Sequence, residues 1–539
     1  MGSKGFIFLL LTGIFHLQTL HAQSFLWAKR VAITVNDDNE LSVGLAIDSL
    51  TNIYVTGWFD GTNNLGGGII LTNKNGGGQD IFLAKYNSSG TLLWARRAGS
   101  NSPDRDGGRG AGVDGADNVY ITGEFSGNAD FPRPLSAPSN QEFFLAKYTS
   151  TGSNVWVRQS IGDAFTTRYG TGLAVDSAGN SYSVGYADNS AATIDFGSDV
   201  IVTNTSFDGY STFLVKYDSA GNPLWAKLMG GDGSHTYATK VALDGAGNIY
   251  VRGSFTHTIT IENTQLVSSG PTDDDEDMFI AKFTNAGDLL WVRRSTGANI
   301  DEGGVAVSPS GDIYVTGWFQ EESTVNFDGI TLTNTGNGDT FLAKYNSLGQ
   351  VQWARKAGGP GLDFFWDVAT DAQGNPFAAG VLSSGATSPA GTGGAVVARY
   401  NTSGAFQWSI SATGAAADPV KSIVAKCAVD RGGHGYIAGW HRTSATFGTT
   451  VLPASGYWNF FLAKVVPPLT LSVQRVASTA QISITATNGS RFALDYSSTL
   501  GAGSWTNLTT NTLSGTSFTY TNTIPAGTTR RYYRARRVP

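Results

Sequence analysis

The feature that constrains the fold most is a short unit that recurs along most of the chain. One copy reads Phe82-Leu-Ala-Lys-Tyr86, then Asn87-Ser-Ser-Gly90, then Leu92-Leu-Trp94-Ala-Arg96. Short runs of aromatic and aliphatic residues, separated by Gly, Asn and Asp, indicate strands joined by tight turns. The unit therefore predicts a strand, a polar turn and a second strand.

The first strand, the tryptophan of the second strand and a pair of apolar runs all recur with the same period. The first strand has seven copies, which begin at Phe82, Phe144, Phe213, Phe279, Phe341, Val396 and Phe461. The tryptophan of the second strand also has seven copies, 55 to 69 residues apart, at Trp27, Trp94, Trp156, Trp225, Trp291, Trp353 and Trp408. Between them lie an apolar run that ends in Asp and another that ends in Gly, as in Leu45–Asp48 and Asn52–Gly57. Four strands in each period predict one propeller blade.

The copies at the two ends of the repeat region complement each other. Trp27 has no first strand before it, and Phe461–Val465 has no tryptophan strand after it. A strand around Trp27 would complete the last blade beside Phe461–Val465 and leave no open sheet edge. We therefore expect an all-β fold, with a seven-bladed β-propeller over residues 24–466 that is closed by its N-terminal strand.

The repeated pattern also resembles a known family. Phe-Leu-Ala-Lys-Tyr, with Asp176-Ser-Ala-Gly-Asn180 and Tyr54-Val-Thr-Gly57, is similar to the seven-bladed β-propeller repeat of secreted bacterial proteins, the SBBP-type repeat. The resemblance covers roughly residues 24–465. It implies a propeller fold but no shared activity, because one fold carries many functions.

Composition and the chain ends narrow the class of protein. Only 14% of the 539 residues are charged, and 69 are glycine, which suits many short strands and turns. The formal net charge of −6 argues against nucleic acid as a partner. Residues 1–22 read as a signal peptide, with Lys4, an apolar stretch Gly5–Phe15 and Ala22 before the cleavage point. We expect an exported, secreted or cell-surface monomer without a membrane span.

Residues 468–539 form a separate predicted domain. After Pro467-Pro468 come alternating Thr- and Ser-rich strands at 481–485, 492–496, 517–521 and 532–536. This pattern predicts a small β-sandwich. Together with Ser504-Trp-Thr-Asn-Leu508 it resembles a C-terminal β-domain of secreted proteins from planctomycete- and verrucomicrobium-type bacteria.

The loops predict where a ligand would bind. The first-to-second and third-to-fourth strand turns are short and share one face, whereas the other connections are long, irregular and share the opposite face. Long, variable loops are the usual place for binding. The residue after the second-strand glycine is aromatic in four blades and would lie near the long-loop face: Trp58, Tyr186, Trp318 and Trp440. We predict either sugar stacking by these rings or packing between blades.

Acidic residues also gather on the long-loop face. The densest run is Asp273, Asp274, Asp275, Glu276 and Asp277. Carboxylates at this density could hold Ca²⁺, although the spacing matches no EF-hand, and the alternative is a solvated charge run. No other cofactor is expected.

Other repeated polar residues have structural explanations. The repeated Asp of the first turn, as at Asp48 and Asp114, would cap that turn rather than bind metal. The repeated Lys, as at Lys85, would pair with this Asp in each blade except the fifth, where Ser308 replaces Asp. The repeated tryptophans would pack towards a neighbouring blade, and the single cysteine, Cys427, would be buried.

Three functions remain open. We favour a secreted, non-enzymatic binding propeller for a glycan or an extracellular protein. The alternatives are a polysaccharide hydrolase or lyase that uses loop carboxylates, and a structural cell-surface or matrix component with a C-terminal attachment or sorting domain. Enzyme activity has less support, because no metal-ligand histidine spacing, nucleophile elbow or phosphate loop occurs.

Overall fold

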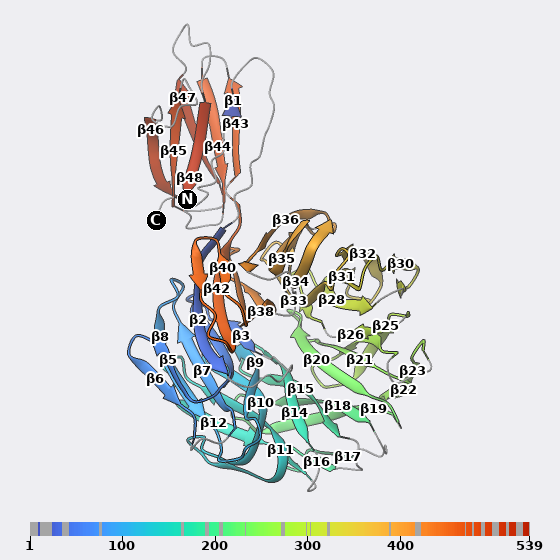
Figure 1. The fold of residues 1–539 in the computed structure, drawn as a ribbon. Helices are drawn as coiled ribbons and strands as arrows, with labels where there is room; N and C mark the ends of the chain where they lie inside the picture. Colours follow the sequence, from blue (N-terminus) through green and yellow to red (C-terminus); the bar gives the residue numbers. More distant parts are fainter. Residues whose placement is uncertain are drawn as a thin grey trace. The chain divides into compact units, whose positions relative to one another are not determined.

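A computed structural model shows an all-β protein. It describes residues 9–10, 24–34, 43–74, 78–162, 167–188, 193–203, 209–231, 233–270, 275–297, 299–301, 303–320, 324–387, 390–414, 422–468, 470–476, 479–486, 491–497, 506–513, 517–523 and 532–537. All secondary structure in these residues is strand (Figure 1). The chain divides into unit 1, residues 1–26, 429–435 and 464–539, and unit 2, residues 27–428 and 436–463.

Unit 2 repeats one sheet, in which four strands pair in antiparallel chain order. The first copies are sheet 1, β3 (Gly44–Ile47), β4 (Ile53–Phe59), β7 (Asp80–Tyr86) and β8 (Leu92–Ala98); sheet 2, β9 (Gly107–Val113), β10 (Val119–Ala129), β11 (Leu135–Tyr148) and β12 (Asn154–Gln159); and sheet 3, β14 (Arg168–Val175), β15 (Ser181–Asp188), β18 (Tyr210–Tyr217) and β19 (Pro223–Gly230). These are the strands that the repeated unit predicts.

The remaining copies keep the same order. They are sheet 4, β20 (Thr236–Leu243), β21 (Ile249–Phe255), β24 (Asp277–Phe283) and β25 (Leu289–Arg294); sheet 5, β27 (Val305–Val307), β28 (Ile313–Gln320), β31 (Gly338–Tyr345) and β32 (Val351–Ala357), with β26 (Ile300–Asp301) also on β28; and sheet 6, β33 (Phe364–Thr370), β34 (Pro376–Thr387), β35 (Ala390–Tyr400) and β36 (Phe406–Ser411). In sheet 7, β38 (Ser422–Val429), β39 (Gly435–His441) and β42 (Trp458–Val466) are followed by the N-terminal strand β2 (Ser24–Thr34).

The first strand of each sheet lies innermost. From β3 to β33, successive first strands contact one another, whereas the fourth strands form outer edges. Figure 1 shows the sheets of unit 2 arranged around a common centre. Their interiors are apolar, and the second and third strands are buried almost throughout. The first strands therefore surround the centre of the unit.

The repeated tryptophans hold neighbouring sheets together, as predicted. Trp94 Nε1 donates to the Ser150 carbonyl of the next sheet at 3.1 Å, and Trp156 Nε1 donates to the Ser219 carbonyl at 3.2 Å. The glycine of the contacted turn adopts a positive φ, and its Cα lies against the indole: a Cβ on Gly152 would come within 2.9 Å of the Trp94 ring. Glycine is needed there for both reasons.

The predicted Lys–Asp pairs are present in several sheets but not in sheet 3, where Lys216 donates to the Asn285 carbonyl at 3.0 Å instead. Lys85 lies 3.1 Å from Asp48 and Lys147 lies 3.3 Å from Asp114. In sheet 5 the prediction of an exception was wrong, because Lys344 pairs at 2.9 Å with Asp312, at the other end of the same turn. The repeated Asp also accepts backbone N–H groups of its turn, such as Asn118 N on Asp114 at 2.9 Å. These carboxylates therefore cap turns.

The connections between second and third strands are more regular than predicted. Five of them contain a short hairpin: β5–β6 (Thr62–Gly66, Ile69–Thr72), β16–β17 (Thr193–Asp195, Ile201–Thr203), β22–β23 (Thr258–Ile261, Thr264–Val267), β29–β30 (Thr324–Phe327, Ile330–Thr333) and β40–β41 (Ala445–Phe447, Thr450–Leu452). Several hairpins pair with the end of the preceding sheet. For example, Ile261 of β22 pairs with Met229 of β19. The alternation of apolar and polar residues within these loops is the sequence pattern that could have predicted the hairpins.

The C-terminal part of unit 1 contains two sheets around one apolar core. One sheet has the order β43 (Thr470–Val476), β44 (Thr479–Thr485) and β47 (Ser517–Thr523). The other has the order β1 (Leu9–Leu10), β48 (Tyr532–Arg537), β45 (Arg491–Ser497) and β46 (Thr506–Thr512). Ile482, Phe492 and Tyr533 belong to the shared core. The four strands predicted after residue 480 are present.

Candidate functional site

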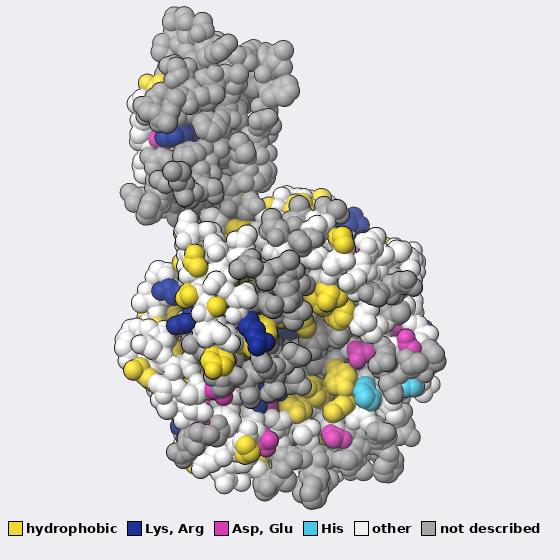
Figure 2. Space-filling model, in the orientation of Figure 1, with side chains coloured by type: hydrophobic (Ala, Val, Ile, Leu, Met, Phe, Trp, Pro, Cys, Tyr) yellow, Lys and Arg dark blue, Asp and Glu magenta, His cyan; other side chains and the backbone are white. Residues whose placement is uncertain are grey.

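Aromatic side chains collect where the inner strands of unit 2 begin, on the side of the long connections. Figure 2 shows hydrophobic side chains around a hollow near the middle of this unit, with histidine and acidic side chains close by. The described residues form two aromatic clusters here, each built by strands from neighbouring sheets. We refer to them as the tyrosine cluster and the tryptophan cluster.

The tyrosine cluster joins sheets 3 and 4. Its members, all half-buried, are Tyr169, Tyr186, Tyr210, His235 and Tyr237. Tyr169 and Tyr186 are directly paired across β14 and β15, and their ring centroids are 4.9 Å apart. Tyr186 also lies 5.2 Å from the Tyr237 ring of the next sheet. Rings at these separations support one another while part of their surface remains available to a ligand.

Polar groups border the tyrosine cluster. The Tyr237 hydroxyl lies 3.3 Å from His235 Nδ1. The Arg109 guanidinium lies 5.4 Å from the centre of the Tyr169 ring, and its Nε donates to Glu124 at 2.6 Å. Arg105 pairs with the same carboxylate at 3.3 Å. The cluster therefore combines aromatic surface with hydroxyl, imidazole and guanidinium groups, which is the mixture that orients a polar ligand.

The tryptophan cluster joins sheets 5 and 6. Trp318 lies edge-on to Phe364, with ring centroids 4.7 Å apart, and Phe364 stacks on Trp366 at 5.8 Å. All three residues are half-buried. Trp318 comes from the end of β28, whereas Phe364 and Trp366 come from the start of β33. The cluster thus lies at the same level of its sheets as the tyrosine cluster.

The four predicted ring positions have different surroundings. Tyr186 and Trp318 are half-buried members of the two clusters. Trp58 and Trp440 are 1% and 0% exposed, and both rings pack against Phe460 in a shared core. The prediction that these two stack on a sugar is therefore wrong, because neither ring presents a face to a ligand. Sequence analysis missed Tyr169, Tyr210, Tyr237, Phe364 and Trp366.

The acidic run 273–277 is placed only in part. Asp273 and Asp274 lie outside the described residues, and Asp275 and Glu276 are half-buried. Asp277 is buried, and its carboxylate accepts from Ser269 N at 2.8 Å, Ser269 Oγ at 2.7 Å and Arg294 at 2.9 Å. Within the described ranges no three His, Cys, Asp or Glu side chains gather as metal ligands would. Ca²⁺ binding by the run stays a prediction.

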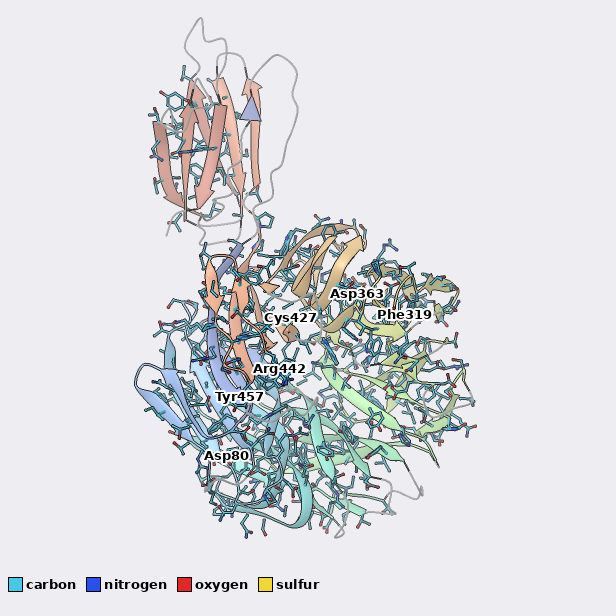
Figure 3. All side chains as sticks on the ribbon, viewed as in Figure 1. Asp80, Phe319, Asp363, Cys427, Arg442 and Tyr457 are labelled. Carbon is cyan, nitrogen blue, oxygen red and sulfur yellow. The ribbon has the colours of Figure 1, made fainter. Side chains whose placement is uncertain are left out.

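Several acidic residues of the connections are buried structural acceptors. Asp106 accepts Ser100 N at 2.6 Å and Ser126 N at 2.7 Å, and Asp363 accepts Ser383 N at 2.6 Å and Gly359 N at 2.8 Å. Figure 3 marks Asp363 and Asp80. Asp80 pairs with Arg97 at 2.6 Å. Because all three are at most 1% exposed, these carboxylates hold loops in place and are shielded from a large substrate.

The burial of Asp106 leads to a prediction about pH. Burial raises its pKa from 3.8 to about 7, against the lowering effect of Ser126 and Ser100. The folded protein therefore binds this proton more tightly, so this group's contribution to stability falls as pH rises from about 4 to about 7. We expect Asp106→Asn to remove this decrease in the free energy of unfolding, which is at most about 1.4 kcal/mol per pH unit.

Denaturation of both proteins at several pH values measures the difference. His441 acts in the opposite direction, because burial lowers its pKa, and comparison of the two proteins cancels its contribution. An identical pH dependence in Asp106→Asn would show that Asp106 does not titrate in this window.

A salt bridge crosses the centre of unit 2 beneath the two clusters. Lys240 of β20 lies 3.2 Å from Asp367 of β33, although sheet 5 comes between their sheets in the chain. Cys427 N of β38 donates to the same carboxylate at 2.9 Å. Cys427 is buried, as predicted, and lies near the middle of the sheets in Figure 3. Three inner strands therefore meet at Asp367.

Comparisons with known proteins agree with this fold. The model of the SBBP β-propeller repeat matches residues 155–190 and 224–254. An uncharacterized WD repeat-containing protein, L264, of Acanthamoeba polyphaga mimivirus is 25% identical over 419 residues, 65% of this chain and 30% of that protein. The regulatory protein FlaEY of Caulobacter vibrioides is 28% identical over 142 residues, 26% of this chain and 14% of that protein. The chain is a β-propeller repeat protein.

The matches to curated relatives span less than a third of those relatives' own length. Among solved structures, a polysaccharide lyase, Uly1, aligns with a TM-score of 0.41 at 9% identity and covers 85% of this chain and 98% of its own. An exo-β-1,3-galactanase from Phanerochaete chrysosporium aligns with a TM-score of 0.28 at 7% identity, over 95% and 96% of the two chains. Alignments this loose carry no argument about activity. In the described part of the chain, no helix is long and apolar enough to cross a membrane.

Proposed function

We propose that this protein is an exported glycan-binding propeller whose ligand lies against the tyrosine cluster. In this proposal the seven sheets close into a seven-bladed ring, residues 1–22 are a signal peptide, and residues 468–539 form a small β-sandwich. The ligand occupies the long-connection side of the ring, where the inner strands begin. The same face is the proposed binding surface if the protein binds a ligand other than a glycan.

The half-buried tyrosine cluster is the observation that carries the proposal. Each of four tyrosine rings from two sheets lies 4.9 to 5.7 Å from at least one other, and all four residues are only half-buried. Tyrosine offers both an apolar ring face and a hydroxyl, as a sugar ring offers both C–H groups and hydroxyls. Aromatic surface with a few directed polar groups is the usual composition of a small-ligand site.

The described residues give less support to the alternative function, a hydrolase or lyase, than to glycan binding. Such an enzyme requires two carboxylates that reach a substrate from opposite sides of one bond. Asp80, Asp106 and Asp363 are buried and already accept hydrogen bonds from the loops or strands around them. Glu124 is 0% exposed and accepts from two arginines. These four carboxylates are therefore shielded from a substrate and do not supply the pair that general acid and base catalysis needs.

A glycan array with the mature chain tests the proposal. We expect saturable binding that weakens at least about tenfold in Tyr237→Ala, because about 1.4 kcal/mol of stacking and hydrogen bonding is lost. Tyr457→Ala is the matched control, since Tyr457 is 49% exposed and has no described ring contact with the cluster. It should bind as the unaltered protein does.

Two outcomes would contradict the proposal. One is that no glycan binds the unaltered protein. The other is binding that Tyr237→Ala leaves intact while its melting temperature is unchanged. A protein ligand would then become the better explanation for this face.

A further inference from the structure

The inner strands share a feature that the repeat pattern alone does not show. Each of the strands β9, β14, β20 and β33 contains a β-bulge. At the bulge, one extra residue of the first strand has no partner on the second strand of its sheet. The inserted residues are Arg109, Thr171, Thr239 and Trp366. Bulges redirect one side chain and are common beside active and binding sites.

Two of the inserted residues have a structural role. Thr171 Oγ donates to the Ala238 carbonyl of the next inner strand at 2.5 Å, and Thr239 Oγ donates to the Gly303 carbonyl at 3.1 Å. In β14 and β20 the inserted residue is therefore a threonine that ties one inner strand to the next. Trp366 has no hydroxyl and cannot make this bond. Its half-buried ring stacks on Phe364 instead.

The strands that carry the tryptophan cluster and the tyrosine cluster come close to one another near the centre of unit 2. The salt bridge between Lys240 and Asp367 brings β20 and β33 together. Tyr237 precedes Lys240 by three residues, which is about 10 Å of strand, and Trp366 immediately precedes Asp367. The intervening inner strand, β27, has only three residues and follows Gly303 and Gly304.

We propose that the tryptophan cluster is a second stacking platform and that the ligand is an extended, linear sugar chain that contacts both clusters. This inference rests on the proposed function and names the class of ligand. A chain long enough to lie on both platforms gains contacts that a short one cannot make. Affinity should therefore rise with chain length, and Trp366 should be responsible for the increase.

The test compares disaccharides with hexasaccharides of cello-, xylo- and galacturono-oligosaccharide series by calorimetry. The unaltered protein should bind the hexasaccharide of its preferred series at least about tenfold more tightly than the disaccharide. Trp366→Thr, which introduces the residue that β14 and β20 carry at this position, should bind both equally, with unchanged disaccharide affinity. Trp366→Phe keeps an aromatic ring and should retain most of the length dependence.

The outcomes separate the two proposals. Length-independent binding by the unaltered protein, or full length dependence in Trp366→Thr, overturns the second platform and leaves glycan binding intact. No binding of any series overturns both. If Trp366→Thr does not fold, Phe364→Leu, at the other side of the same stack, should reduce the length dependence in its place, and an unchanged dependence in that variant overturns the inference.

Discussion

Glu142→Ala should destabilise unit 2 by about 3 to 5 kcal/mol, which is the usual cost of removing one partner from a buried ion pair. Glu142 Oε1 accepts from Arg168 at 2.8 Å, and Arg168 is 0% exposed. The pair joins β11 of sheet 2 to β14 of sheet 3. Chemical denaturation followed by tryptophan fluorescence measures the loss, which arises because the arginine remains buried without this carboxylate.

Two controls make the result specific to burial. Glu262 pairs with Lys227 at 2.7 Å, but both side chains are about a third exposed, so Glu262→Ala should cost less than about 1 kcal/mol. The double variant Glu142→Leu with Arg168→Met should recover most of the loss, because apolar residues can replace a buried pair. Equal losses of stability in Glu142→Ala and Glu262→Ala would show that the buried pair contributes no more to stability than the exposed one.

Trp156→Ala should also cost about 3 to 5 kcal/mol, because it removes a large ring from the contact between sheets 2 and 3. Trp156 is 7% exposed, its ring lies edge-on to Tyr120 at 5.7 Å, and a Cβ on Gly221 would come within 2.8 Å of it. A lower denaturation midpoint is the expected result. Leu224→Ala is the control, since this neighbouring edge-strand side chain is 48% exposed.

A second comparison isolates the indole hydrogen bond. Trp156→Phe removes the bond to the Ser219 carbonyl and should cost about 1 kcal/mol more than Trp225→Phe. Trp225 occupies the same repeat position, but its buried Nε1 has no acceptor. Equal costs for the two substitutions would mean that packing alone holds the sheets together at this position.

Much of the architecture could be predicted because it depends on local, repeated chemistry. The strands follow short apolar runs, the turns follow Asp, Asn and Gly, and the tryptophans recur where one sheet meets the next. Repetition turns a weak local signal into a strong one, since every copy must satisfy the same contacts. The Lys–Asp pairs followed for the same reason, and sheet 5 keeps the pair by moving the acid from position 308 to Asp312.

The candidate site could be predicted only in part. The long-connection side was identified from loop length, and two of the four chosen rings, Tyr186 and Trp318, lie in the aromatic clusters. Comparison of the inner strands could have added Trp366, because it stands where Thr171 and Thr239 stand in other copies. Without a structure, however, a bulge cannot be distinguished from a change of strand register.

The sequence by itself determined the strand order, the turns and the contacts that recur with the period, because these depend on residues that are close along the chain or equivalent between copies. Tertiary structure decided which aromatic rings a ligand could reach. Trp58 and Trp440 occupy the same repeat position as Tyr186 and Trp318, yet Phe460 covers the first pair. Exposure depends on what the neighbouring sheet supplies, and the same holds for Lys240 and Asp367, which meet across 127 residues only when the sheets surround a common centre.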